Sequence, residues 1–352
     1  MNKIIITGVT GQDGSILSEM LLDDDANHIY GAYRRVAGRS YKNLDNISSN
    51  PFFSLVDMDL TDPHSVSRVV SSVKPDFFIN FAANSFVGNS WDMPVNHFET
   101  NCMGVVHCLE AIRQHAPHCK FVSAGTSEMF GDVQYSPQDE KHPLRPRSPY
   151  GASKCAAHHA IKVYRESYGM HASHAISFNH ESVKRGVEFL PQKVAHGVAR
   201  ISLAMKNGKN YRPLVVGNLD AKRDWSHAND IVRGIWKMAN LTKPKDYVLA
   251  SGKTHTIRDL ISAAFQVVGI ECAFEGSGFG EKIFIANADR RFNIVEVSKQ
   301  FYRPAEVDLL MGDYSLAKQD FGWEPKISFN ELIKEMVCAA IEKTKNEKSK
   351  TN

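Results

Sequence analysis

Cysteine is scarce in this sequence, and the few cysteines follow no metal-binding or disulfide pattern. Six are spread over 352 residues without a C-x-x-C pair: Cys102, Cys108, Cys119, Cys155, Cys272 and Cys338. This scatter argues against both a zinc site and a disulfide framework. We therefore expect no metal centre, and cysteines that serve as packing residues in a reducing compartment.

Long apolar runs and an excess of charge of one sign are also missing. No apolar run approaches membrane-spanning length, and the N-terminal stretch MNKIIITGVTG leads into a predicted strand and glycine turn rather than a signal peptide. The 42 basic and 39 acidic residues are interspersed and leave a net charge of +3, so no basic face predicts a nucleic-acid or membrane partner. We expect a cytoplasmic protein.

Short apolar segments alternate with segments of helical period along the first half of the chain. This alternation predicts an α/β protein with a Rossmann-type doubly wound parallel sheet, whose ligands bind at the carboxyl ends of the strands. A smaller C-terminal α/β substrate domain should follow. We expect residues 1–180 to form the Rossmann-type domain and residues 181–345 mainly the smaller domain, with the segment around 215–240 returning to the first. The predicted strands are 3–7, 28–33, 52–56, 76–82, 120–125 and 171–178, and the predicted helices are 15–22, 64–73, 99–115 and 150–169.

The first strand runs into TGVTGQDGS, which spaces Gly8, Gly11 and Gly14 as G-x-x-G-x-x-G before a helix. One glycine makes the turn, one admits a pyrophosphate and one lets helix and strand pack closely, so the pattern favours a dinucleotide site over a simple tight turn. The second strand ends in Arg34 and Arg35, where an enzyme that selects NAD usually has Asp or Glu. Two arginines suit a 2′-phosphate and favour NADP, although a solvated basic turn would look the same.

Tyr150 and Lys154 are one helical turn apart in RSPYGASK and share a face. A phenol is a weak base at neutral pH, but a neighbouring ammonium and the positive charge of an oxidised nicotinamide favour the phenolate. Tyr150 can then take a hydroxyl proton as a hydride leaves. The Y-x-x-x-K pattern is common by chance, and the preceding dinucleotide pattern is what favours a catalytic role.

AGTSEMFG places a carboxylate directly after a buried strand. If this backbone is extended, Thr126 and Glu128 point to the same side and Ser127 points away. Thr126 can hydrogen-bond the hydroxyl that Tyr150 deprotonates. Glu128 is surplus to simple alcohol oxidation, but an elimination needs a base for the proton next to the new ketone and an acid for the departing hydroxyl. Glu128 therefore predicts a dehydratase rather than an epimerase or reductase.

Taken together, these motifs resemble the GDP-mannose 4,6-dehydratases of the extended short-chain dehydrogenase/reductase group. The resemblance extends over nearly the whole chain, and LDAKRDW and RPAEVD are its more specific motifs. It implies a lyase that converts GDP-mannose to GDP-4-keto-6-deoxymannose and water by internal hydride transfer through bound NADP. It also implies a homodimer or homotetramer, paired through the helices at 99–115 and 150–168.

The resemblance assigns roles to individual residues. The implied catalytic residues are Thr126, Glu128, Tyr150 and Lys154. The implied cofactor-binding residues are Gly8, Gly11, Gln12, Asp13, Gly14, Arg34, Arg35, Asp59, Leu60, Ala82, Ala83, Ser85, Tyr150, Lys154, His180 and Arg185. The implied substrate-binding residues are Ser85, Thr126, Asn179, Lys193, Arg223 and Arg303.

Four features depart from the family pattern. One is the segment RRVAGRS, where the family usually has Arg-Arg followed by serines, and the other three are single positions. Asn84 replaces a longer amide, Phe86 replaces a histidine, and Asn96 stands where a cofactor-contacting tyrosine is expected. They leave the sugar open, so the alternatives to GDP-mannose are GDP-heptose and GDP-N-acetylglucosamine. A GDP-sugar epimerase or reductase of the same fold is the other alternative.

Overall fold

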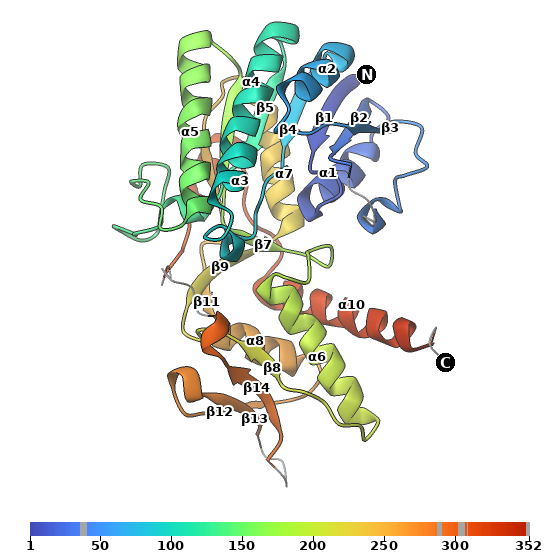
Figure 1. Ribbon diagram of the computed structural model, residues 1–352, viewed down its shortest axis with the longest axis vertical. Helices are drawn as coiled ribbons and strands as arrows, with labels where there is room; N and C mark the ends of the chain where they lie inside the picture. Colours follow the sequence, from blue (N-terminus) through green and yellow to red (C-terminus); the bar gives the residue numbers. More distant parts are fainter. Residues whose placement is uncertain (36–40, 287–290, 302–306, 308, 350–352) are drawn as a thin grey trace.

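The computed structural model describes residues 1–35, 41–286, 291–301, 307 and 309–349, and its upper lobe is built on a seven-stranded parallel sheet (Figure 1). The strand order is β10-β6-β5-β4-β1-β2-β3. The strands are β1 Asn2–Thr7, β2 Asn27–Tyr33, β3 Phe53–Asp57, β4 Phe77–Asn80, β5 Lys120–Ala124, β6 Ala172–Ser177 and β10 Tyr247–Leu249. All six strands expected in the first half are present, and β10 from the second half adds the seventh. The predicted doubly wound fold is confirmed.

Helices cover both faces of this sheet (Figure 1). Ile4 and Ile6 of β1 pack in the cluster that holds α1 and α7, whereas Ile5 packs in the cluster that holds α2, α4 and α5. Side chains of a strand alternate between faces, so a strand buried on both sides is apolar at every position. These helices are α1 Gln12–Leu22, α7 Ala228–Ala239, α2 Pro63–Val73, α4 Gly104–His115 and α5 Pro149–Tyr168.

The single helix expected at 99–115 is wrong in its start and its continuity. It begins earlier, as α3 Pro94–Phe98, passes through a π-helical turn, η3 Glu99–Met103, and continues as α4. The π turn contains the buried Asn101, whose amide bonds Asn84 and Ser153. Periodicity alone does not reveal such a bulge, because the bonds that hold it come from distant residues.

The lower lobe has its own core. Helices α6 Leu190–Lys206, α8 Ile257–Gln266 and α10 Phe329–Ser349 pack with a four-stranded sheet of order β12-β13-β14-β8 (Figure 1). Its strands are β12 Cys272–Glu275, β13 Lys282–Ile285, β14 Asn293–Val297 and β8 Leu214–Val216. A three-stranded sheet, β7 Asn179–Glu181, β9 Lys222–His227 and β11 Thr254–Thr256, lies between the lobes. The remaining elements are α9 Ser315–Phe321 and the short turns η1 Lys42–Leu44, η2 Val87–Asn89, η4 Ser127–Met129, η5 Gly278–Gly280 and η6 Lys299–Phe301. Among the helices of the described residues, none combines the length and the apolar character that crossing a membrane requires.

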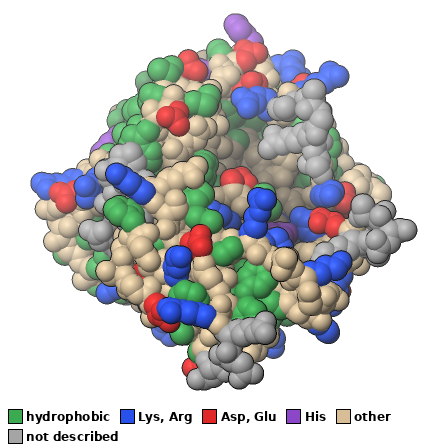
Figure 2. Space-filling view, turned by 60° about the horizontal axis from the view of Figure 1, so that its bottom comes forward, with side chains coloured by type: hydrophobic (Ala, Val, Ile, Leu, Met, Phe, Trp, Pro, Cys, Tyr) green, Lys and Arg blue, Asp and Glu red, His purple; other side chains and the backbone are tan. Residues whose placement is uncertain are grey.

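A cavity of about 890 Å³ opens between the lobes. Its wall includes the carboxyl ends of β1, β4, β5 and β6, and residues of α6, β8 and β9 line the opposite side. Figure 2 shows the hollow, with Lys, Arg, Asp and Glu side chains along its rim. It lies where ligands of doubly wound sheets bind.

Candidate active site

The glycine turn after β1 forms one end of the cavity. Gly8 has φ +64°, and a Cβ there would lie 2.9 Å from the backbone nitrogen of Ala82. Gly14 lies so close to β1 that a Cβ would come within 2.6 Å of the carbonyl oxygen of Gly8. Gly11 and Gln12 line the cavity where α1 begins. This cradle, which any Cβ would fill, fits a diphosphate at a helix N-terminus.

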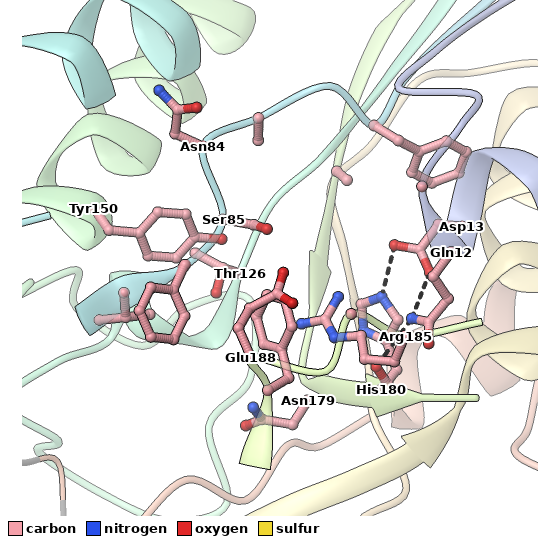
Figure 3. Close-up of a pocket in the computed structure, with 18 of the residues that line it drawn as sticks. Gln12, Asp13, Asn84, Ser85, Thr126, Tyr150, Asn179, His180, Arg185 and Glu188 are labelled. Atoms are coloured by element: carbon pink, nitrogen blue, oxygen red, sulfur yellow. Dashed lines mark hydrogen bonds and ion pairs between the residues drawn. The ribbon is translucent and has the colours of Figure 1, made fainter. Parts of the chain in front are cut away.

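An ion pair joins α1 to β7 beside this turn. His180 Nε2 lies 3.0 Å from Asp13 Oδ2, and the amide of Gln12 donates to the carbonyl of His180 (Figure 3). Burial opposes charge on both groups, but their mutual attraction outweighs it, which lowers the pKa of Asp13 and raises the pKa of His180. Each group thus favours the charged form of the other, and the pair fixes α1 against the strand that enters the lower lobe.

Thr126 and Glu128 both line the cavity, as expected, but the backbone between them is not extended. The hydroxyl of Thr126 accepts a hydrogen bond from the N–H of Glu128 at 3.2 Å, and the turn η4 begins there. The extended backbone expected for this segment is therefore wrong, and Ser127 lines the cavity as well. A local bond from side chain to backbone has replaced the strand conformation.

Tyr150 and Lys154 are brought to the same cavity by α5, and both are buried. The hydroxyl of Ser148 caps the helix by accepting from the N–H of Gly151, where a Cβ would lie 2.6 Å from the carbonyl of Glu128. Glycine at that position therefore lets α5 begin directly against η4. Figure 3 shows the Tyr150 hydroxyl directed toward Thr126 and Ser85.

The pKa of Tyr150 is shifted in the direction opposite to the one expected from the sequence. Burial raises the pKa of Tyr150 to about 12, with a hydrogen bond from Thr126 acting against the rise and the charge of Glu128 adding to it. Burial also lowers the pKa of Lys154 to about 8, and its Nζ donates to the carbonyl of Ala124 at 2.8 Å. In the protein alone, the increase in the pKa of Tyr150 caused by desolvation is larger than the decrease expected from the Lys154 ammonium.

The turn after β4 carries Ala82, Ala83, Asn84 and Ser85 along the cavity wall. Asn84 and Asn96, two of the departures from the family pattern, are partners: Asn84 Nδ2 donates to Asn96 Oδ1 at 2.5 Å. The backbone N–H of Asn84 also donates to Asn101 Oδ1 at 2.8 Å. The shorter amide is thus held by α3 and the π turn.

Further predicted cofactor residues lie around the glycine turn. Arg34 and Arg35 are both exposed to solvent, and Arg34 lines the cavity whereas Arg35 does not. Asp59 and Leu60 line it after β3, and one carboxylate oxygen of Asp59 accepts from both the N–H and the hydroxyl of Thr61.

Predicted substrate residues lie on the lower side. Asn179, Lys193 and Arg223 all line the cavity. Lys193 Nζ lies 3.6 Å from the ring centre of Phe301, and Arg223 donates to the carbonyl of Val307 at 2.6 Å. Arg303 lies outside the described residues.

Two phenylalanines that line the cavity, Phe86 and Phe189, were not predicted from the sequence. The guanidinium of Arg185 lies 3.5 Å from the ring centre of Phe189, and that ring meets Phe86 edge to face at 5.9 Å. Glu188 lines the cavity next to this group (Figure 3). Arg185 and Phe189 are four residues apart, but the chain between them forms turns rather than a helix, so helical spacing did not predict their contact. The contact with Phe86 had no local signal either, because that residue is about a hundred positions away.

The sequence matches the family model for GDP-mannose 4,6 dehydratase over residues 5–336. The chain belongs to this family of hydro-lyases. A GDP-mannose 4,6-dehydratase of Yersinia enterocolitica is 38% identical over 360 residues, covering 98% of this chain and 95% of that protein. The Homo sapiens GDP-mannose 4,6 dehydratase is 36% identical over 350 residues, covering 97% and 92%. The resemblance inferred from the motifs is confirmed.

Solved structures confirm the fold. A dTDP-glucose 4,6-dehydratase of Bacillus anthracis in complex with NAD superposes with a TM-score of 0.79 at 20% identity, covering 99% of this chain and 98% of that one. The RMD protein of Pseudomonas aeruginosa complexed with NADPH gives 0.74 at 19% identity, covering 97% and 100%.

Proposed function

We propose that this protein is a GDP-mannose 4,6-dehydratase that uses bound NADP to convert GDP-mannose to GDP-4-keto-6-deoxymannose and water. Family membership supports the class of reaction. The observation that carries the proposal is the carboxylate of Glu128 in the same cavity as Thr126, Tyr150 and Lys154. An epimerase or reductase has no need of that carboxylate.

The cofactor would lie along the upper wall of the cavity. Gly8, Gly11 and the first turn of α1 would hold the diphosphate, and Asp59 and Leu60 would border the adenine. Arg34 at the end of β2 favours NADP over NAD, because a guanidinium pairs with a 2′-phosphate. When bound, the nicotinamide ring supplies reversible hydride acceptance, so that the loss of water needs no outside oxidant or reductant.

Tyr150 is proposed as the base that removes the proton of the C4 hydroxyl. Thr126 holds that hydroxyl through its own, and Lys154 adds positive charge that favours the phenolate. Because burial in the protein alone raises the pKa of Tyr150, the base must become active once the site is filled. This gives a site that is inert without its ligands.

Glu128 is proposed to carry out the elimination. The ketone at C4 acidifies C5, whose proton the carboxylate takes. Protonated Glu128 then gives that proton to the C6 hydroxyl, which leaves as water. One group thus serves as base and then as acid. C6 would then regain the hydride removed from C4, and C5 would take the proton held by Tyr150, so that cofactor and enzyme return to their starting states.

The nucleotide-sugar would extend into the lower lobe, where Lys193 and Arg223 suit a diphosphate and Asn179 suits sugar or phosphate oxygens. On this assignment, residues 1–180 mainly serve the cofactor and residues 181–345 mainly serve the substrate.

A panel of GDP-mannose, GDP-heptose and GDP-N-acetylglucosamine, analysed by mass spectrometry, tests the reaction and the sugar together. We expect GDP-mannose to lose one water with no net change in NADP. Loss of water from only another GDP-sugar would correct the substrate, and no loss from any would overturn the proposal. Consumption of NADPH in step with product would instead indicate a reductase.

We further propose that the protein is a homodimer or homotetramer. Met103, Val163 and Tyr168 are exposed apolar side chains of the π turn and of α5, on the helices expected to pair. Sedimentation at micromolar concentration should show a species larger than the 39.3 kDa chain, and a monomer alone would contradict the proposal.

A further inference from the structure

Two histidines face each other behind the strand that leads to Thr126 and Glu128. His174 of β6 is fully buried, and its Nδ1 lies 3.1 Å from Nδ1 of His158 on α5. His158 follows Lys154 by four residues, so both side chains lie on one face of the helix. At this distance the two rings share a single hydrogen bond, which requires that one Nδ1 carry a proton and the other accept it.

The buried imidazole supports the backbone of the candidate site. His174 pairs in register with Ser123 of β5. A Cβ on Gly125 would lie 2.9 Å from Cε1 and 3.0 Å from Nε2 of His174, so the ring edge lies directly against that residue. Gly125 connects Thr126 to the Ala124 carbonyl, which accepts from Lys154 Nζ. Nε2 of His174 is buried without a hydrogen-bond partner among the residues described.

The charges around the pair favour its neutral form. Burial lowers the pKa of His158 and His174, and Arg165 acts in the same direction on both. The groups that face His158 are Asp246, His159, Arg165 and Lys162, and those that face His174 are His158, Lys154 and Arg165. Asp246 is already paired with Arg165 through two bonds of 2.8 Å and accepts from the N–H of His174.

We propose that His158 and His174 are positioning residues that, as a neutral pair, hold Gly125 and the Ala124 carbonyl beneath Lys154. An added proton places a buried positive charge behind the Lys154 ammonium, and a further proton makes both facing Nδ1 atoms donors, so that the rings must separate. When the rings separate, the contact of the His174 ring with Gly125 is lost as well. The pair would thereby set the acid limb of the pH profile of the reaction.

The direct test is amide hydrogen exchange of the peptide that contains residues 120–130, measured from about pH 7 down to about pH 4, because both pKa values are lowered from 6.5, and corrected for the intrinsic exchange rate. In the native protein, protection should fall as the pair takes up protons. In His158→Asn the amide can either donate to or accept from His174, so a proton on His174 no longer forces the two side chains apart, and protection should stay level at acid pH. His159→Gln, on the exposed neighbour, is the matched control and should behave like the native protein. Equal pH dependence in His158→Asn and the native protein would overturn the inference.

The second test is the pH profile of kcat, and only this readout rests on the proposed function. One pH unit below the controlling pKa, native kcat should be about tenfold below its plateau, while His158→Asn should hold its plateau further into acid and leave KM unchanged. If His158→Asn does not fold, imidazole NMR of the native protein replaces it: two histidine signals must titrate together, and independent titration overturns the inference. Lack of turnover with GDP-mannose, combined with the expected exchange result, would count against the proposed function and not against the histidine pair.

Discussion

Gly14→Ala tests the glycine cradle, because the structure fixes how far α1 must move. The new Cβ would lie 2.6 Å from the Gly8 carbonyl oxygen and 2.7 Å from the Cα of Val9, both of them backbone atoms, whereas ordinary contact begins at 3.4 Å. The helix must therefore retreat by about 0.8 Å from β1, since no flexible side chain can move aside. Overpacking of this kind costs about 2–3 kcal/mol. With an unfolding entropy of about 2.1 cal/mol/K per residue, this cost lowers Tm by about 3–4 °C for a chain of this length.

Gly280→Ala is the matched control, because no heavy atom of the described structure lies within 4 Å of a Cβ at that position. Calorimetry should show a Tm within about 1 °C of the native value for this variant. Fluorescence titration with NADPH should show an affinity about tenfold or more weaker for Gly14→Ala only, since a misplaced helix N-terminus no longer meets the diphosphate. Similar Tm and NADPH affinity in the two variants would refute the close packing of α1 on the glycine turn.

Three other predictions concern the cofactor, the buried ion pair and the sugar pocket. Arg34→Ala should weaken NADP binding about tenfold or more and leave NAD binding nearly unchanged, whereas Arg35→Ala, on the exposed neighbour, should have little effect in the same titrations. Because the pKa of His180 is raised above 6.5 by Asp13, the His180 proton stabilises the fold below pH 6.5, and this stabilisation is lost as the pH rises through the raised value. His180→Gln should therefore flatten the decline of Tm above pH 6.5, and an unchanged decline would contradict the ion pair. Phe86→His should change KM for GDP-mannose more than it changes NADPH affinity, and the reverse ranking would place Phe86 on the cofactor side.

The sheet and the positions of the main catalytic candidates were predictable from the sequence because they depend on local patterns. Ile4 to Ile6 are apolar in succession because both faces of β1 are buried, and Gly8 to Gly14 specify the turn within seven residues. Tyr150 and Lys154 meet because a helix repeats every 3.6 residues. Each of these inferences needed only neighbouring residues.

The features that could not be predicted depend on contacts between distant segments or on competition between local bonds. The hydrogen bond between Asn84 and Asn96 depends on the π turn. The hydrogen bond between His158 and His174 depends on the packing of α5 on β6. The η4 turn was not predicted, because this segment can either continue as a strand or form a turn in which the Thr126 hydroxyl accepts from the N–H of residue 128. The sequence AGTSE favours neither conformation. The raised pKa of Tyr150 is a consequence of burial, which the sequence does not report.

The central claim, that Glu128 makes this protein a dehydratase, is tested most directly by Glu128→Gln in single-turnover experiments with GDP-mannose. The amide keeps the shape of the side chain but can neither take the C5 proton nor deliver one to the C6 hydroxyl. The account predicts that absorbance of reduced nicotinamide still appears, because oxidation at C4 depends on Tyr150, while water loss followed by mass spectrometry slows by about a hundredfold to ten-thousandfold. Glu188→Gln, the same change elsewhere on the cavity wall, should still release dehydrated product. Water loss at close to the native rate in Glu128→Gln would contradict the account.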